Sequence, residues 1–368
     1  MVPTSRRRFL RVVAGTGATL GMGGAAWLLG SARRESSSRR SGGDDLARAR
    51  ARDVADSSSG TDDGELRVAR RASWALGSNV SIVALHSDRR VAEAAIDDAF
   101  AELELVEEVM SLYRPHSHLC LLNRDGRLDD PHPYLLEVLR YAGETSLRSG
   151  GAFDVTVQPL WSLYSSARKR GRLPDAAEVA AARRSVDWRR VEVSDRCVRL
   201  RGEGTAITLN GIAQGFASDR AAAALEARGV EHALIDTGEV NSLGAGDRPD
   251  GWNVGIQHPR EADAYVYMAQ LQGRCLATSG DYATAFSDDF RLNHLFDPRT
   301  GRSPESLASV SIAAPTGMAA DALSTAVFVL GPRRGLALVE STPGADALFV
   351  LKNGRMLKTE GFPPHGEV

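Results

Sequence analysis

The order of helix-like and strand-like segments is the strongest constraint on the fold of this chain. From about Arg67 onward, short strand patterns, hairpins and helix patterns follow one another without the regular β-α alternation of a doubly wound parallel sheet. This irregular order predicts an α+β fold. Because neither an internal repeat nor an internal linker interrupts it, we expect a single domain.

Hydrophobic periodicity places the individual elements. Alternating or β-branched runs predict strands at residues 80–85, 233–235, 252–256, 265–271 and 310–313. Apolar residues at helical spacing predict helices at residues 90–111, 132–149, 175–184, 213–228 and 319–330. The last two helices should end at Gly229 and at Gly331-Pro332. Residues 190–193, 198–200 and 206–209 are expected to form a small meander.

The overall charge gives no electrostatic reason to expect a nucleic-acid partner. The 368 residues include 45 basic and 47 acidic side chains, for a formal net charge of −2. The three cysteines, Cys120, Cys197 and Cys275, lie far apart and form no C-x-x-C pair, which argues against a structural zinc site or a disulfide framework. Separate buried thiols are the favoured interpretation, and one disulfide stays open.

The N-terminus carries an export pattern. Residues 5–11 (SRRRFLR) resemble the twin-arginine signal, and residues 12–32 carry no charge. We expect residues 1–32 to engage the twin-arginine export machinery, residues 33–66 to form a disordered linker, and residues 67–368 to fold. The protein should reach the periplasm or the outer face of the inner membrane. Cleavage of the signal and its retention as a membrane anchor both stay open.

Four downstream segments combine glycine, aspartate, threonine and histidine in ways that suit a ligand site. They are residues 150–160 (GGAFDVTVQPL), 210–219 (NGIAQGFASD), 278–282 (TSGDY) with 294–301 (HLFDPRTG), and 319–326 (AADALSTA). Glycine turns let the backbone approach a ligand and expose N–H groups to phosphate oxygens.

Two pairs of residues in these segments suggest chemistry. Asp321 and Thr325 are four residues apart on a predicted helix, so their oxygens share one face. A carboxylate, a hydroxyl and backbone carbonyls suit Mg²⁺, which could neutralise a pyrophosphate. His294, near Asp297, is a candidate proton acceptor.

Each candidate also has a structural interpretation. Asp321 suits a helix cap, Asp154 suits the cap of a local bend, and residues 297–301 suit a turn. His116 and His118 have no third ligand nearby in the sequence and are expected on the surface.

Taken together and in order, the four segments resemble the flavin transferase (ApbE) family. The family patterns run roughly G-a-F-D-p-T-v-x-P-L, D-L-G-G-I-A-K-G-Y-x-x-D, T-S-G-D-Y, H-I-x-D-P-R-T-G and A-D-x-x-x-T-A. Residues 110–117 (MSLYRPHS), with Leu122-Asn123 after them, resemble the family's early y-R-p-x-S…l-N segment. The resemblance spans about residues 70–352.

The resemblance implies a T-fold-related α+β domain that takes FAD as a substrate and Mg²⁺ as a cofactor. It implies transfer of FMN to a threonine or serine hydroxyl of an acceptor protein, with release of AMP. Exported members would serve flavoproteins of a membrane respiratory or electron-transfer complex. Position by position, the FAD contacts would be Leu76, Tyr113, Ala152, Phe153, Asp154, Thr208, Gln214 and Leu295. Asp321, Thr325 and the Gly211 carbonyl would bind the metal, and His294 would lie near the reaction centre.

Some positions depart from the family pattern. Thr208 stands where the family usually has Asp, Gln214 where Lys or Glu is common, and Asn210 where the first glycine of a pair is expected. Glu239 interrupts a segment that usually reads n-x-G-G. Two alternative functions therefore stay open: a non-catalytic FAD-binding maturation factor, and a Mg²⁺-dependent FAD pyrophosphatase that uses water as the acceptor.

Overall fold

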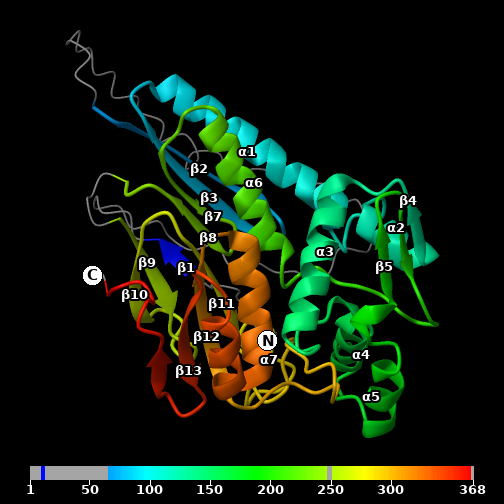
Figure 1. The fold of residues 1–368 in the computed structure, drawn as a ribbon. Helices are drawn as coiled ribbons and strands as arrows, with labels where there is room; N and C mark the ends of the chain where they lie inside the picture. Colours follow the sequence, from blue (N-terminus) through cyan, green and yellow to red (C-terminus); the bar gives the residue numbers. More distant parts are fainter. Residues whose placement is uncertain (1–9, 13–64, 247–250, 366–368) are drawn as a thin grey trace, which may run out of the picture. The chain divides into compact units, whose positions relative to one another are not determined.

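Eight antiparallel strands form the main sheet of the structure, a computed structural model that describes residues 10–12, 65–246 and 251–365. Figure 1 shows the sheet, whose strand order is β14-β13-β12-β11-β8-β7-β3-β2. The strand bounds, in chain order, are β2 Arg67–Ala75, β3 Ser78–His86, β7 His232–Asp236, β8 Val240–Leu243, β11 Cys275–Gly280, β12 Leu307–Ala314, β13 Asp346–Leu351 and β14 Met356–Lys358.

Side chains alternate across the main sheet, because successive residues of a strand point to opposite faces. In β3, Val80, Ile82 and Ala84 belong to the larger hydrophobic core, whereas Leu85 belongs to a second core on the other face. Every residue of β11 and β12 is buried. The middle of the sheet is therefore covered on both faces.

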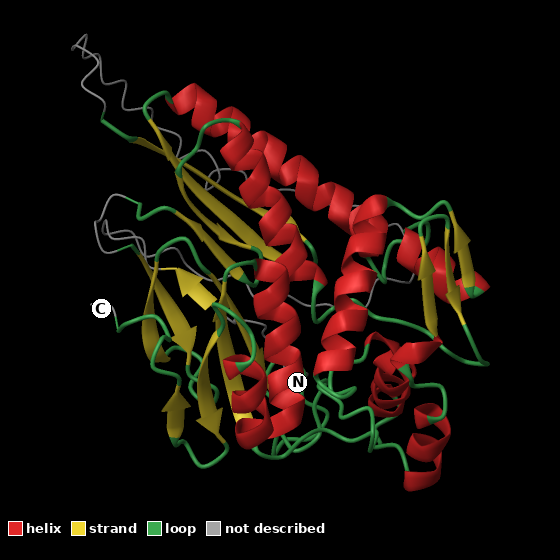
Figure 2. Cartoon of the chain, in the orientation of Figure 1, coloured by secondary structure: helices red, strands yellow, loops and turns green. Residues whose placement is uncertain are grey.

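Helices cover one face of the main sheet, as Figure 2 shows. They are α1 Arg89–Met110, α6 Ala213–Ala227 and α7 Gly317–Glu340. Gly331, with φ of 73°, interrupts α7 just before Pro332, as the sequence predicts, and a second helical stretch continues to Glu340. Of the described helices, α7 alone is long and apolar enough to cross a bilayer, but most of it is buried against the sheet and belongs to the core.

A second sheet of three strands contributes the core on the opposite face. Its order is β1-β9-β10, with β1 Leu10–Val12, β9 Trp252–Gln257 and β10 Tyr265–Leu271. Trp252, Val254 and Ile256 pack with Leu234 and Leu276 of the main sheet. Residues 10–12 lie inside the predicted export signal and pair antiparallel with β9. The rest of that signal and the predicted linker, up to residue 64, lie outside the described residues.

Four helices and a small sheet complete the described fold. The helices are α2 His118–Asp125, α3 Pro133–Arg148, α4 Gln158–Lys169 and α5 Ala176–Arg183, with 3-10 turns at Val155–Val157 and Trp188–Arg190. The sheet has the order β4-β6-β5, with β4 Arg127–Asp129, β5 Val191–Ser194 and β6 Cys197–Leu200.

The expectation of a strand at residues 206–209 is wrong, because these residues lie outside the small sheet and β4 takes the third place. The side chain of Asn123 supplies the missing partners instead. Its Nδ2 donates to the Ile207 carbonyl at 2.8 Å, and its Oδ1 accepts from the Ile207 N–H at 2.7 Å. The extended segment is thus held by a side chain rather than by a strand ladder.

The α+β class predicted from the sequence is confirmed by these mixed layers, and the predicted helices and the other strands are present within a few residues. The three cysteines are free thiols, with Cys275 buried and the other two partly buried. His116 is exposed as expected, whereas His118 is partly buried and its Nδ1 accepts from the His132 N–H at 3.1 Å.

Candidate active site

Leu76 lies in the tight turn between β2 and β3. Leu76 and Gly77 have φ of 51° and 68°, and they join a register that pairs Ala75 with Ser78. Two consecutive residues with positive φ form the turn that matches the twist of a two-residue hairpin. A leucine in this conformation is uncommon and strained, and such strain concentrates at functional sites. Its side chain is partly buried against the larger core.

The turn at residues 150–154 is fixed by hydrogen bonds to Asp154. Its Oδ1 accepts from the Thr156 N–H at 2.8 Å and from Thr156 Oγ1 at 2.6 Å, and its Oδ2 accepts from the Trp188 N–H at 3.0 Å. Burial raises the pKa of Asp154, and these hydrogen bonds oppose the shift. The carboxylate caps a local bend, as its structural interpretation predicted. Ala152 and Phe153 are buried beside it.

Thr208 lies next to this turn, because its backbone N–H donates to the Val155 carbonyl at 2.8 Å. Its hydroxyl accepts from the Asn210 N–H at 3.3 Å, which shapes the bend that leads to Gly211. Tyr113 follows α1 and is 47% exposed, with its N–H donating to Ser111 Oγ. Tyrosine rings are side chains on which planar ligands can stack.

Gly211 meets Thr325 where the segment before α6 crosses α7. A β-carbon at Gly211 would lie 2.7 Å from Thr325 Oγ1, so only glycine allows this approach. Thr325 Oγ1 also lies 3.5 Å from Ser279 Oγ, which forms a 2.8 Å hydrogen bond with Ser324 Oγ. Three of the four sequence segments, those containing Gly211, Ser279 and Thr325, therefore meet at one point.

Asp321 is buried one helical turn before Thr325. Its Oδ2 accepts from the Gly215 N–H at 3.0 Å, and the described residues offer Oδ1 no hydrogen-bond donor. Burial raises the pKa of Asp321 to about 7, and the nearby Asp219 carboxylate adds to the shift. Asp219 itself caps the start of α7, accepting from the N–H groups of Gly317 and Met318. Thr316 is the N-cap residue of α7, because its Oγ1 accepts from the Ala319 N–H at 3.2 Å, so Thr316 and Asp219 rather than Asp321 cap this helix.

Gln214 links the start of α6 to the turn between β7 and β8. Its Nε2 donates to the Thr237 carbonyl at 2.9 Å, and Thr237 Oγ1 donates to the Gln214 carbonyl at 3.1 Å. Ser78 Oγ donates to the same Thr237 carbonyl at 3.4 Å. These bonds bring Gln214 beside the hairpin turn that carries Leu76.

The buried Glu239 continues this chain of contacts toward Ser279. Its Oε2 accepts from the Thr278 N–H at 3.1 Å. The Leu76 turn, Gln214, Glu239, Ser279 and Thr325 are thus connected by successive contacts. The sequence alone does not predict Thr237 or Ser279 as site residues, although Ser279 stands in the TSGDY motif.

His294 and Leu295 lie on the long loop between β11 and β12. The His294 N–H donates to the Thr284 carbonyl at 3.0 Å, and the buried Leu295 packs into the same core as Phe153. Asp297, three residues after His294, is engaged by Arg299. Its carboxylate accepts from the backbone N–H, Nε and Nη2 of Arg299. Residues 297–301 form a turn, which agrees with the structural interpretation of this segment.

The donor set at the α6–α7 crossing fits a hard divalent cation. Among the described residues, no group of three or more His, Cys, Asp or Glu side chains is arranged to hold a metal ion. A metal here would use one carboxylate, hydroxyls and a backbone carbonyl, a set that suits Mg²⁺ because it keeps waters and phosphates as further ligands. Burial raises the pKa of the Asp321 carboxyl to about 7, and a bound cation would lower that pKa and leave the carboxyl fully ionised.

The structure therefore connects the residues predicted to bind metal with several of those predicted to contact FAD. Gly211, Asp321, Thr325, Gln214 and Leu76 are linked by contacts. The segment of residues 207–214 also connects them to a second group, Thr208 with Ala152, Phe153 and Asp154. Tyr113 follows α1 and His294 lies on the loop between β11 and β12, so both come from segments other than those that carry Gly211, Asp321 and Thr325.

Comparison with known proteins gives one consistent family. The sequence model of the ApbE family matches residues 76–349. The FAD:protein FMN transferase of Treponema pallidum (strain Nichols) is 32% identical over 307 residues, covering 76% of this chain and 84% of the relative. The FAD:protein FMN transferase of Escherichia coli (strain K12) is 29% identical over 272 residues, covering 70% of this chain and 77% of the relative.

Solved structures agree with this match. The apo form of the Pseudomonas stutzeri flavinyl transferase ApbE superposes with a TM-score of 0.68 at 30% identity, covering 81% of this chain and 96% of that one. The ApbE protein of Thermotoga maritima superposes with a TM-score of 0.71 at 28% identity, covering 80% and 97%.

Proposed function

The chain belongs to the ApbE family, and we propose that it transfers FMN from FAD to a threonine or serine hydroxyl of an acceptor flavoprotein, with Mg²⁺ as cofactor and AMP as leaving group. The relatives named as FAD:protein FMN transferases place the enzyme among the transferases. The observation that carries the proposal is the meeting of Gly211, Ser279 and Thr325 beside the buried Asp321. Such a cluster of hard oxygen atoms suits a metal that holds phosphates.

The proposed site divides the work among these residues. Asp321, Thr325 and the Gly211 carbonyl would hold Mg²⁺, which when bound supplies positive charge to the pyrophosphate and its leaving group. Leu76, Tyr113, Ala152, Phe153, Asp154, Thr208, Gln214 and Leu295 are proposed to contact FAD. The exposed ring of Tyr113 offers a stacking surface for the flavin.

In the proposed reaction the acceptor hydroxyl oxygen forms a bond to the phosphorus of the FMN half of FAD. The bond between that phosphorus and the bridging oxygen breaks, and AMP leaves with the bridging oxygen. His294 accepts the proton of the hydroxyl. Positioning and charge neutralisation supply most of the rate enhancement, as in other phosphoryl transfers.

The departures from the family pattern at Thr208 and Gln214 are compatible with this proposal. Both residues make hydrogen bonds that shape the site, Thr208 to the Asn210 N–H and Gln214 to the Thr237 carbonyl. Uncharged side chains at these positions keep the local backbone in place. They also remove a charge that the family usually provides near the ligand, so we expect weaker FAD binding than in relatives that retain it.

The decisive experiment mixes the full-length protein, FAD and Mg²⁺ with a flavoprotein acceptor domain from the same organism. Flavin fluorescence that stays with the acceptor band on a denaturing gel, together with AMP release, would support the transferase. Asp321→Ala should abolish both. Free FMN and AMP without a labelled acceptor would identify a pyrophosphatase instead. Bound FAD with neither product would identify a binding protein.

We also propose that the enzyme works outside the cytoplasm. Residues 1–32 would be the twin-arginine signal, residues 33–66 a linker, and residues 67–368 the catalytic domain that serves a membrane respiratory or electron-transfer complex. Replacing Arg6 and Arg7 with lysine in the full chain should leave the protein in the cytoplasm. Unchanged export of that variant would reject the twin-arginine route.

A further inference from the structure

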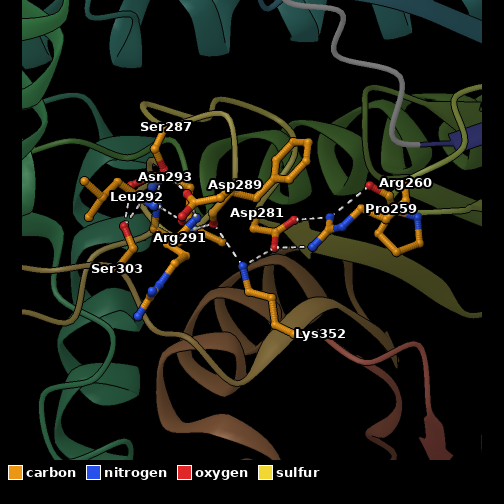
Figure 3. A network of polar contacts seen from close by, with 12 residues as sticks. Pro259, Arg260, Asp281, Ser287, Asp289, Arg291, Leu292, Asn293, Ser303 and Lys352 are labelled. Atoms are coloured by element: carbon orange, nitrogen blue, oxygen red, sulfur yellow. Dashed lines mark hydrogen bonds and ion pairs between the residues drawn. The ribbon is translucent and has the colours of Figure 1, made fainter.

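The loop that carries His294 is fastened to the main sheet by a buried ionic cluster, which Figure 3 shows from close by. Asp281, the first residue after β11, is completely buried. Its two carboxylate oxygens accept from Nη1 and Nη2 of Arg260 at 2.7 and 2.8 Å, and Lys352 Nζ also donates to Oδ2. Two cations thus surround one carboxylate, so either cation alone is sufficient to neutralise it.

Both cations also contact Phe290, near the tip of the loop. Lys352 Nζ donates to the Phe290 carbonyl at 2.9 Å, and the guanidinium of Arg260 stacks over the Phe290 ring at 4.5 Å. Phe290 has φ of 60°, a strained conformation for an aromatic residue, which persists only where surrounding contacts enforce it. The lysine and the arginine are two such contacts.

Asn293 passes this constraint on to His294. The fully buried Asn293 donates from Nδ2 to the same Phe290 carbonyl at 3.2 Å, and its Oδ1 accepts from the Leu295 N–H at 3.0 Å. The asparagine side chain therefore binds the backbone on both sides of His294, at the Phe290 carbonyl before it and at the Leu295 N–H after it. Ser303 secures the asparagine in turn, donating to its carbonyl and accepting from its N–H.

We propose that Lys352, Arg260 and Asn293 are positioning residues for the FMN transfer, which set the place of His294 relative to the metal candidates. This proposal rests on the proposed function. Asp281 stands two residues after Ser279, whose hydroxyl lies 3.5 Å from Thr325 Oγ1. One end of the cluster is thus fixed beside the metal candidates and the other end beside the histidine. Displacement of a reacting group by about 1 Å can cost roughly a hundredfold in rate.

Lys352→Met is the most informative variant, because Arg260 still neutralises Asp281 and the buried carboxylate is not left unpaired. The Phe290 carbonyl loses its lysine donor. We expect kcat for FMN transfer to fall by roughly tenfold or more, while the dissociation constant of FAD, measured by flavin fluorescence, stays within about twofold. Lys352→Arg, which can donate to the same carbonyl, should restore most of the rate. Asn293→Ala should act in the same direction.

The matched control is Arg291→Met, on the same loop. Arg291 forms an exposed ion pair with Glu305, in which both side chains are 63% exposed, so its loss should leave kcat unchanged. A double-mutant cycle adds a readout that general destabilisation would not reproduce. In a His294→Ala background, Lys352→Met should cause no further loss, because the lysine acts through the histidine. An unchanged kcat in Lys352→Met, or an undiminished effect in the His294→Ala background, would overturn the proposal.

Failure of the proposed function is recognised separately. If the wild-type protein labels no acceptor, the transferase proposal fails, and the constraint on His294 is then tested without turnover. Hydrogen exchange of the amides of residues 284–295 should speed up in Lys352→Met but not in Arg291→Met. Equal protection in the wild type and both variants would show that Lys352 does not hold this loop.

Discussion

Gly211 and Thr325 pack so closely that the space a side chain would need at position 211 is taken by Thr325. A β-carbon at position 211 would lie 2.7 Å from Thr325 Oγ1 and 3.4 Å from both Thr325 Cβ and Thr325 Cγ2. The two residues are 114 positions apart in the chain, and the crossing of the segment before α6 with α7 brings them together. A side chain at position 211 would therefore push against the Thr325 hydroxyl, which we propose binds Mg²⁺ together with the Gly211 carbonyl.

Gly211→Ala should displace the Thr325 hydroxyl and lower FMN transfer at least about tenfold at a fixed Mg²⁺ concentration. The protein should remain folded, because the contact is with a side chain that can rotate. The measurement is the rate of acceptor labelling as a function of Mg²⁺ concentration. Unchanged labelling at low Mg²⁺ would mean that Gly211 and Thr325 do not share the metal.

Gly215→Ala should instead destabilise the fold. A β-carbon there would lie 2.1 Å from the Gly317 carbonyl oxygen and 2.7 Å from Asp321 Cβ, and neither the backbone nor the packed helix can move away cheaply. We expect a loss of about 2–3 kcal/mol or more in the free energy of unfolding, as for other overpacked cores.

Gly143→Ala is the control for Gly215→Ala, because Gly143 lies within α3 and no atom stands within 4 Å of its added β-carbon. Alanine there should stabilise the protein by about 0.5–1 kcal/mol through helix propensity. Urea unfolding of the two variants measures the contrast. Equal stability of the two would contradict the tight crossing of α6 and α7.

The elements that the sequence predicts well are those whose formation depends on their own residues and on burial of an apolar face. The helix at residues 90–111 follows from its own apolar periodicity, and α1 occupies Arg89–Met110. The segment at residues 206–209 looks like a strand by the same kind of reasoning. Its hydrogen bonds are decided by Asn123, 84 residues away from Ile207, and no local pattern reveals such a partner.

The candidate site shows the same division. The spacing of Asp321 and Thr325 follows from helix geometry alone, whereas the approach of Ser279 to Thr325 depends on the packing of β11 against α7. Lys352 and Asn293 belong to no recognised motif. Both side chains donate to the Phe290 carbonyl. Only the folded chain shows that carbonyl as a common acceptor.

Asp321→Asn should separate metal binding from folding. The asparagine oxygen can still accept from the Gly215 N–H, and the buried site no longer carries a carboxyl whose ionised form is costly. The metal-free variant should therefore be at least as stable as the metal-free wild type at pH 8. Mg²⁺ should raise the Tm of the wild type but not of the variant.

Removal of metal with EDTA should abolish FMN transfer by the wild type, and excess Mg²⁺ should restore it. Two results would contradict the assignment of Asp321. One is an equal rise in Tm with Mg²⁺ in both proteins, and the other is labelling of the acceptor by Asp321→Asn at the wild-type rate.

Asp236 should make the stability of the protein depend on pH. It ends β7, its Oδ1 accepts from the Gly238 N–H at 2.9 Å, and burial raises its pKa from 3.8 to about 6. Because the folded state holds this proton more tightly than the unfolded state, the contribution of Asp236 to stability is largest below pH 4. It is lost as the pH rises from about 4 to 6. Above that window the ionised carboxylate costs on the order of 3 kcal/mol.

Asp236→Asn keeps the acceptor for the Gly238 N–H and removes the titration. The variant should therefore gain stability relative to the wild type as the pH rises from 4 to 7, by the same order of magnitude. Urea unfolding at several pH values measures the difference, and Asp288→Asn, on the surface, controls for the general loss of one negative charge. A difference between wild type and Asp236→Asn that does not change with pH would show that Asp236 titrates alike in the folded and unfolded chains.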